Sequence, residues 1–80
     1  MDNDYKETER TIIREQGDNL LVKVSGAFMG QFPTTSFELW SNKEAYKNRQ
    51  YRDGEKIYCQ TWAVSEATAV INWEKIINKA

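Results

Sequence analysis

Aromatic and basic side chains alternate over one stretch of the sequence, "WSNKEAYKNRQYRDGEKIYCQTW", residues 40–62. It holds two Trp, three Tyr and five Lys or Arg among 23 residues. Aromatic rings stack on nucleotide bases or anchor protein interfaces, and arginine and lysine bind phosphates or acidic partners. The candidate partner-binding residues of this stretch are Trp40, Lys43, Lys47, Arg49, Tyr51, Arg52, Tyr58 and Trp62.

The same stretch has two interpretations. If Trp40, Tyr58 and Trp62 share one face of a sheet, their rings and the flanking cations form a surface suited to single-stranded nucleic acid or to a protein. Large aromatic residues are usually buried, however. In that case Tyr58 and Trp62 belong to the core beneath a helix, and the cations lie on a solvated helix. The sequence contains no RNA-recognition motif that would favour the first interpretation.

Catalytic chemistry has little support in the sequence. The chain has no histidine, the side chain most often used for proton transfer near neutral pH. Its one cysteine, Cys59, therefore has no histidine to activate it, and in a predicted strand a cysteine usually packs as a small hydrophobic residue. The glycines match no phosphate-binding loop. We expect no catalytic residues, no cofactor and no metal site.

Size and charge predict one small domain over residues 1–80. The chain is 40% hydrophobic, and its 11 basic and 12 acidic residues give a net charge of −1. A near-neutral charge argues against bulk electrostatic binding of nucleic acid. The start of the chain does not resemble a signal peptide, and no segment approaches the roughly 20 apolar residues that span a bilayer. We expect a cytoplasmic protein that binds no membrane.

Short strands must position most of the candidate residues. Alternating apolar residues predict a hairpin of two strands, 11–15 and 20–25, joined by a turn at 16–19. The same patterns predict a third strand over 36–40, a turn at 52–55 and a fourth strand over 56–64. Both faces of the last strand are partly apolar, which predicts a central, covered strand or one binding face. Residues 1–10 are polar and predict a frayed end or a short helical turn over 5–10.

Two helices complete the prediction. Ser41 and Glu44 form a capping box, which predicts a short helix over 42–50. Ser65 caps a second helix. Its apolar stripe consists of Ala69, Val70, Trp73, Ile76, Ile77 and Ala80. We expect Trp73 in the core and this helix over the sheet face that carries Val22, Val24, Phe37 and Leu39.

This order of elements predicts an α+β fold. It is an antiparallel sheet of three to four strands, with a C-terminal amphipathic helix on one face and a short helix between strands 3 and 4. The apolar segment "FMGQFP", residues 28–33, has no place in these elements. It either forms an exposed site for a partner or folds back over the open end of the sheet.

We therefore expect a non-enzymatic binding module that docks on a larger protein as a regulator, inhibitor or accessory subunit, of the kind found among phage-type accessory proteins. The alternative is an RNA-binding or single-stranded nucleic-acid-binding protein that uses the aromatic and basic surface of residues 40–62, with RNA bridging to a protein partner as a combined form. Pairing of an edge strand such as 11–15 with a second copy would give a homodimer.

Overall fold

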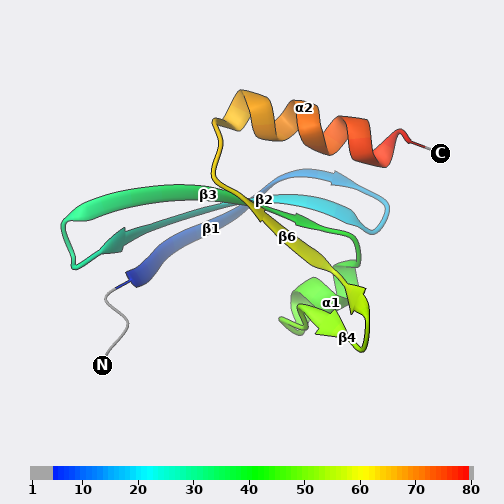
Figure 1. The fold of residues 1–80 in the computed structure, drawn as a ribbon, viewed down its shortest axis with the longest axis horizontal. Helices are drawn as coiled ribbons and strands as arrows, with labels where there is room; N and C mark the ends of the chain where they lie inside the picture. Colours follow the sequence, from blue (N-terminus) through cyan, green and yellow to red (C-terminus); the bar gives the residue numbers. More distant parts are fainter. Residues whose placement is uncertain (1–4, 80) are drawn as a thin grey trace.

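The computed structural model of the protein describes residues 5–79. Four antiparallel strands form one sheet in the order β1-β2-β3-β6, and two short strands form a separate hairpin (Figure 1). In chain order the elements are β1 (Tyr5–Gln16), β2 (Asn19–Phe28), β3 (Phe32–Trp40), α1 (Lys43–Lys47), β4 (Arg52–Asp53), β5 (Lys56–Ile57), β6 (Cys59–Trp62) and α2 (Glu66–Ile77). The predicted α+β class is confirmed, with the short helix after the third strand and the long helix at the C-terminal end.

The β1–β2 hairpin is longer than the sequence predicted. Gln16 pairs with Asn19 across a two-residue turn, in which Gly17 has a positive φ of 59°. Pairing then continues along both strands as far as Tyr5 and Phe28. The predicted helical turn over 5–10 is wrong because β2 offers backbone partners to these residues, with one irregularity between Glu7 and Glu9, whereas a helix there would have no apolar stripe to bury.

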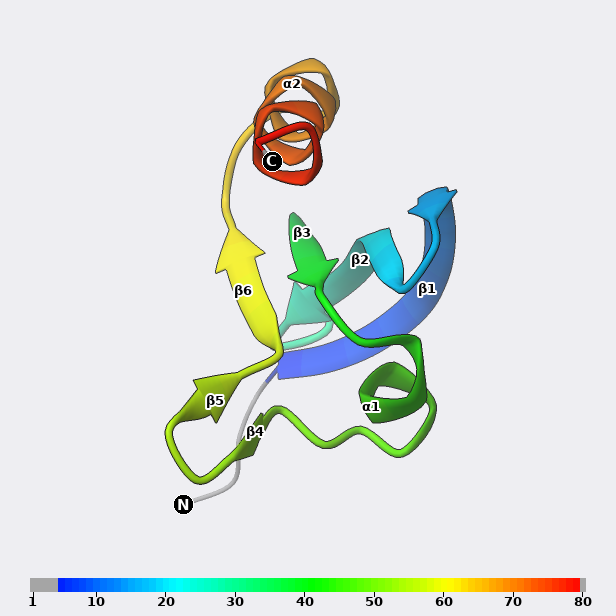
Figure 2. The same ribbon diagram turned by 90° about the vertical axis from the view of Figure 1, so that its right-hand side faces the viewer.

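The sheet has an apolar cluster on each face, and α1 and α2 lie on opposite sides of it (Figure 2). The α2 face carries Leu21, Phe37, Leu39, Ala69 and Trp73. The opposite face carries Leu20, Val22, Val24, Trp40 and Ala45. The predicted placement of Val22 and Val24 on the same face as Phe37 and Leu39 is therefore wrong.

The register between β2 and β3 explains this correction. Leu21 lies opposite Leu39, and Val22 lies opposite Glu38. Residues that face each other across a ladder point to the same side, so a shift of one residue moves a whole apolar set to the other face. β2 is apolar on both sides at Leu20, Leu21 and Val22, and its alternation alone does not fix which set meets α2.

The N-terminal cap of α2 is the predicted residue, whereas the cap of α1 is a different residue from the predicted one. Ser65 caps α2, and its hydroxyl oxygen accepts from the Thr68 N–H at 3.3 Å. For α1 the cap is Asn42, whose Oδ1 accepts from the Ala45 N–H at 3.0 Å, so the predicted Ser41 capping box is wrong. The helix is accordingly shorter than the predicted 42–50.

The apolar stripe of α2 is narrower than predicted. Ala69 and Trp73 are buried, and Trp73 is only 4% exposed, which confirms its place in the core. Ile76 is exposed instead of packed. Ala80, the last residue of the predicted stripe, lies outside the described residues. Within residues 5–79, no helix has the length and apolar character needed to cross a membrane.

The predicted strand over 56–64 is divided into β5 and β6. Gly54, with a φ of 61°, turns the chain between β4 and β5. Tyr58 then leaves the ladder: its N–H donates to the Tyr51 carbonyl, and its carbonyl accepts from the Ser41 N–H. β6 follows as a four-residue edge strand beside β3, so the expectation of a central strand is wrong.

Candidate functional site

The three rings predicted to share one sheet face do not share it. Trp40 is 0% exposed and lies on the face opposite α2, where the rings of Tyr46 and Tyr51 contact it at centroid distances of 5.3 and 5.1 Å. Trp62 pairs with Phe37 and lies half-buried on the α2 face. Tyr58 packs half-buried against the Trp40 cluster. The predicted three-ring platform is therefore absent, and Trp40 is a core residue.

The basic residues of the predicted site lie mostly in solvent. Lys47, Arg49 and Arg52 are exposed, whereas Lys43 is partly covered and forms an ion pair with Glu15. Arg49 sits over the Tyr46 ring, 4.4 Å from its centroid. The Arg49 guanidinium also donates to the Tyr46 carbonyl at 2.5 Å. Lys43 and Lys47 thus lie on α1, Arg52 lies on β4, and Arg49 lies in the segment between these two elements.

A groove of about 480 Å³ opens on the sheet face opposite α2. Its sides come from β1, β2 and β3, with the Tyr51 ring and Ala63 completing the wall. The lining residues are Tyr5, Glu7, Arg10, Val24, Phe28, Thr34, Thr35, Ser36, Glu38, Tyr51 and Ala63. Of the eight partner-binding residues predicted in segment 40–62, only Tyr51 is among these lining residues. Tyr51 is also 48% exposed, so part of the ring is accessible to a partner.

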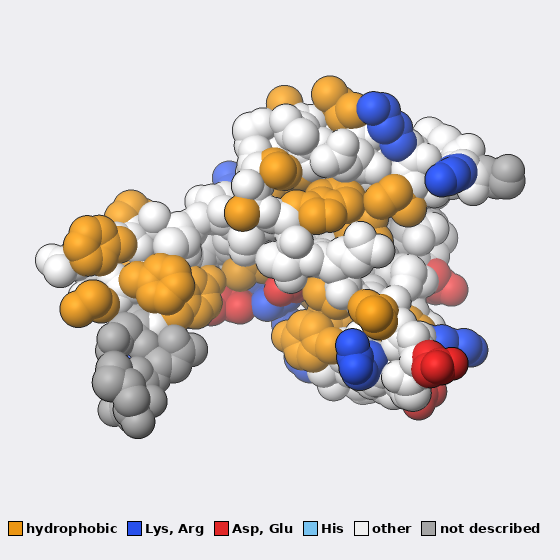
Figure 3. Space-filling model, viewed as in Figure 1, with side chains coloured by type: hydrophobic (Ala, Val, Ile, Leu, Met, Phe, Trp, Pro, Cys, Tyr) orange, Lys and Arg blue, Asp and Glu red, His pale blue; other side chains and the backbone are white. Residues whose placement is uncertain are grey.

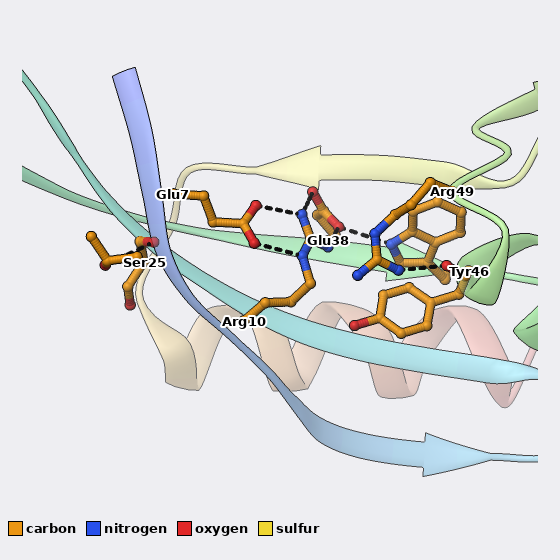
Figure 4. A network of polar contacts seen from close by, with 8 residues as sticks. Glu7, Arg10, Ser25, Glu38, Tyr46 and Arg49 are labelled. Atoms are coloured by element: carbon orange, nitrogen blue, oxygen red, sulfur yellow. Dashed lines mark hydrogen bonds and ion pairs between the residues drawn. The ribbon is translucent and has the colours of Figure 1, made fainter. Parts of the chain in front are cut away.

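An ion-pair network forms one side of this groove (Figure 4). The Arg10 guanidinium donates to both Glu7 oxygens at 2.9 and 2.8 Å and to Glu38 Oε1 at 2.5 Å. The same Glu38 oxygen accepts from the Trp40 indole N–H at 2.9 Å. These bonds join β1 to β3 across β2.

Charges in the network are close to balanced. Hydrogen bonds to Glu7 and Glu38 raise the pKa of the Arg10 guanidinium, so it stays charged. The pKa of Glu7 is lowered, mainly by its hydrogen bond to Arg10 and in smaller part by the charges of Arg10 and Arg49. The charged lining of the groove is therefore one guanidinium and two carboxylates, and Arg10 is hydrogen-bonded to both of these carboxylates.

Sequence reasoning missed this network because its members are far apart in the chain. Arg10 and Glu38 are separated by 28 positions. The available signal was Glu38 itself, a carboxylate between Phe37 and Leu39 in an otherwise apolar strand. A buried carboxylate requires a cationic or hydrogen-bonding partner, but the sequence contains 11 Lys or Arg and does not indicate which one.

The turn between β2 and β3 carries an exposed apolar group, which we call the tip: Phe28, Met29 and Phe32. These side chains are 47%, 64% and 56% exposed. Hydrophobic side chains gather at this end of the hairpin, away from α2 (Figure 3). The Tyr5 ring contacts Phe28 at 5.2 Å, which connects the tip to the groove. The predicted alternative, a loop folded back over the sheet, is wrong.

No charged residue occurs over positions 24–37, although 29% of the chain is charged. This segment includes the tip and the β3 residues Thr34, Thr35 and Ser36, which line the groove together with Glu38. An exposed surface without charges is unusual for a solvated loop and typical of a contact site. The sequence signal for an apolar segment outside the predicted elements was therefore present in "FMGQFP", and the structure shows Phe28, Met29 and Phe32 exposed.

Cys59 lies half-buried beside the Trp40 cluster. Burial, together with the charge of Glu38, raises the pKa of its thiol to about 12. The thiolate is the reactive form, so at pH 8 its fraction is about 10⁻⁴. Within residues 5–79, no three His, Cys, Asp or Glu side chains gather to hold a metal ion.

We expect the Cys59 thiol of the native protein to react with iodoacetamide at pH 8 at least about a hundredfold more slowly than the same thiol in denaturant. Mass spectrometry of samples quenched at intervals measures both rates. Equal rates would show that Cys59 is accessible and ionised in the folded protein, which contradicts its position against the core.

Comparisons with known protein families, with curated proteins and with solved structures found no match to this chain.

Proposed function

We propose that the protein is a non-enzymatic docking module of the cytoplasm that binds a larger protein and acts as its regulator, inhibitor or accessory subunit. The observation that carries this proposal is the exposed, charge-free tip beside the groove. Soluble proteins rarely leave contiguous apolar side chains in water unless a partner covers them. The contact surface consists of the tip, the groove and the exposed ring of Tyr51.

The energetics of the tip are suited to an interface anchor. Full burial of a Phe or Met side chain is worth about 1.5–3 kcal/mol, and these side chains are about half exposed. A partner that covers the tip therefore gains about 1 kcal/mol from each of them. Phe28 is already held against Tyr5, so little conformational freedom of that ring is lost on binding.

Nucleic-acid binding has less support than protein binding. The ring platform on which it depended is absent, because Trp40 is buried and Trp62 faces α2. Exposed Tyr51, Arg49 and Arg52 are the residues that it would still use. Counterion release makes nucleic-acid binding fall steeply with salt, so nuclease treatment and a salt series separate the two functions.

The test is capture of a partner from a lysate of the source cells, with the protein immobilised and nuclease added to half of the samples. A triple variant, Phe28→Ser with Met29→Ser and Phe32→Ser, is expected to retain less than a tenth of the captured partner, because it removes the apolar anchor. The matched control is Ile71→Ser with Ile76→Ser, which changes exposed apolar residues of α2. Mass spectrometry quantifies the partner.

Capture that depends on the tip and survives nuclease supports the proposal. Equal capture by the triple variant and the control would remove the tip from the contact surface. Loss of the partner on nuclease treatment would instead assign the protein to the nucleic-acid alternative.

A further inference from the structure

The β1 edge of the sheet and the opposite edge differ in how they are protected against pairing with another strand. β1 carries six charged residues, and its pairing with β2 is irregular between Glu7 and Glu9 and between Ile12 and Arg14. Charges and bulges are the usual devices that prevent an edge strand from pairing with another chain. β1 is therefore a poor template for a further strand, including one from a second copy.

β3 presents a second and different edge. β6 pairs only with Phe37–Trp40, so residues 32–36 have no neighbouring strand on that side within the described part of the chain. We call the backbone of residues 32–36 on this side the open edge. It contains no charged residue. Thr34, Thr35, Ser36 and Ala63 line the groove, so the groove borders the open edge directly.

Pro33 indicates which backbone groups the open edge offers. Pro33 remains in register with Ala27 of β2, and a strand tolerates proline where the missing N–H points away from the ladder. Backbone groups alternate between the two sides of an antiparallel strand, so Thr35 also directs its N–H and C=O away from β2. The open edge therefore offers the Pro33 carbonyl and both backbone groups of Thr35.

We propose that an extended, uncharged segment of a partner protein adds to the open edge as a short strand and places an apolar side chain in the groove. This inference rests on the proposed docking function and specifies what docks. Unpaired backbone groups at strand spacing are recognised by another extended backbone, while pockets beside the edge select its alternate side chains. Five residues of strand span about 17 Å, which suits a short linear segment.

The residues that line the groove indicate the charge of the partner side chain that would enter it. Arg10 is already bonded to both carboxylates that line the groove, Glu7 and Glu38. A charged side chain entering here would lose its hydration and would have to compete for groups that are already paired with each other. The rings of Tyr5, Phe28 and Tyr51 instead offer apolar contact. An aromatic or aliphatic side chain fits this environment.

A second copy of the chain is a poorer occupant than a foreign segment. In a two-fold pairing of β3 with itself centred on Thr34, Pro33 of each copy lies opposite Thr35 of the other. Because neither proline donates, two of the four ladder bonds at these positions are lost. A partner strand without proline loses only one.

The probe is a phage-displayed library of random twelve-residue peptides, selected on the immobilised full chain, and a synthetic peptide from the enriched group. Two variants are compared, Thr35→Pro, which removes the N–H of the open edge, and Thr35→Val, which keeps it. We expect the enriched peptides to share an uncharged segment with an aromatic or large aliphatic residue. We expect Thr35→Pro to weaken peptide binding at least tenfold and Thr35→Val less than threefold, as measured by fluorescence anisotropy.

Amide hydrogen exchange of the unmodified protein gives a second test that does not depend on how the variants fold. The Thr35 N–H is expected to exchange at least tenfold more slowly when the peptide is bound, because the added strand accepts its hydrogen bond. An unchanged Thr35 exchange rate overturns strand addition, and so does the absence of any enriched peptide.

The outcomes also separate this inference from the proposed function. If Thr35→Pro binds the peptide as tightly as Thr35→Val while the tip variant loses the lysate partner, strand addition is overturned and docking stands. If the tip variant retains the lysate partner, the proposed contact surface itself fails. A concentration-dependent dimer in light scattering that Thr35→Pro abolishes would show that the occupant is a second copy, which also overturns the inference.

Discussion

Replacement of Trp40 by alanine is expected to lower the free energy of unfolding by about 3–5 kcal/mol, the usual cost of truncating a fully buried Trp. Trp40 is 0% exposed, contacts two tyrosine rings and donates to Glu38. A chain of 80 residues has a small core, and this loss is a large part of the total stability of such a domain. Urea unfolding followed by circular dichroism measures the change.

Trp73 provides the matched control for the indole hydrogen bond. Both indoles are buried, but within residues 5–79 the Trp73 N–H has no hydrogen-bond partner, whereas the Trp40 N–H donates to Glu38. Trp40→Phe is therefore expected to cost about 1 kcal/mol more than Trp73→Phe, because it leaves the Glu38 carboxylate with one donor fewer. Equal losses would mean that the Trp40–Glu38 bond adds nothing to stability. A loss below 1 kcal/mol for Trp40→Ala would contradict its burial.

Local sequence patterns predicted which elements form, and they failed where the result depends on pairing between strands. The alternation of residues 20–25 identified β2, and the spacing of Ala69 and Trp73 identified α2. The faces were assigned wrongly because Leu21 and Val22 are both buried, on opposite sides of the sheet. Only the register with β3 decides which of them meets α2.

The sequence indicated only some residues of the candidate site, because the site also depends on which distant segments the fold brings together. Tyr51 was named as a contact residue and lines the groove, whereas Trp40 was named and is buried. The segment 28–33, which contains the tip, was predicted as one of two alternatives to be a contact site because it is apolar. Nothing local could show that it would stand beside the groove, since Tyr5 and Tyr51 reach the groove from elements that are distant in sequence.

In the folded protein, segment 40–62 does not form the aromatic and basic binding surface that the sequence suggested. Its aromatic residues mainly build the core around Trp40, and its cations remain in solvent around α1. The charge-free segment 24–37, which lacks the mixture of rings and cations typical of a binding motif, supplies the exposed apolar surface. Large aromatic residues are highly buried on average, which is why an aromatic-rich stretch is a weak indicator of an exposed surface.

Replacement of Arg10 by methionine is expected to lower the free energy of unfolding by about 3 kcal/mol, because it removes one partner of a buried ion pair. The side chains of Arg10 and Glu38 are 12% and 11% exposed. Without Arg10, the Glu38 carboxylate keeps only the Trp40 N–H as a hydrogen-bond donor among these contacts. Urea unfolding at pH 7 measures the loss. At that pH the ion pair of Glu7 with Arg10 contributes fully to stability. This contribution begins to decrease as the pH falls below 4.5, the ordinary pKa of Glu, and is lost as the pH passes through the lowered pKa of Glu7 in the folded protein.

The double variant Arg10→Met with Glu38→Leu distinguishes the loss of a favourable pair from the exposure of an unpaired charge. A buried pair replaced on both sides by apolar residues is often close to neutral, so the double variant is expected to be more stable than Arg10→Met alone by at least about 1 kcal/mol. Additive losses would mean that the two residues act independently. Recovery in the double variant would mean that Arg10 is needed because Glu38 is buried. Glu38 would then connect the core to the groove, since the same carboxylate oxygen accepts from the Trp40 indole in the core and from Arg10 in the groove.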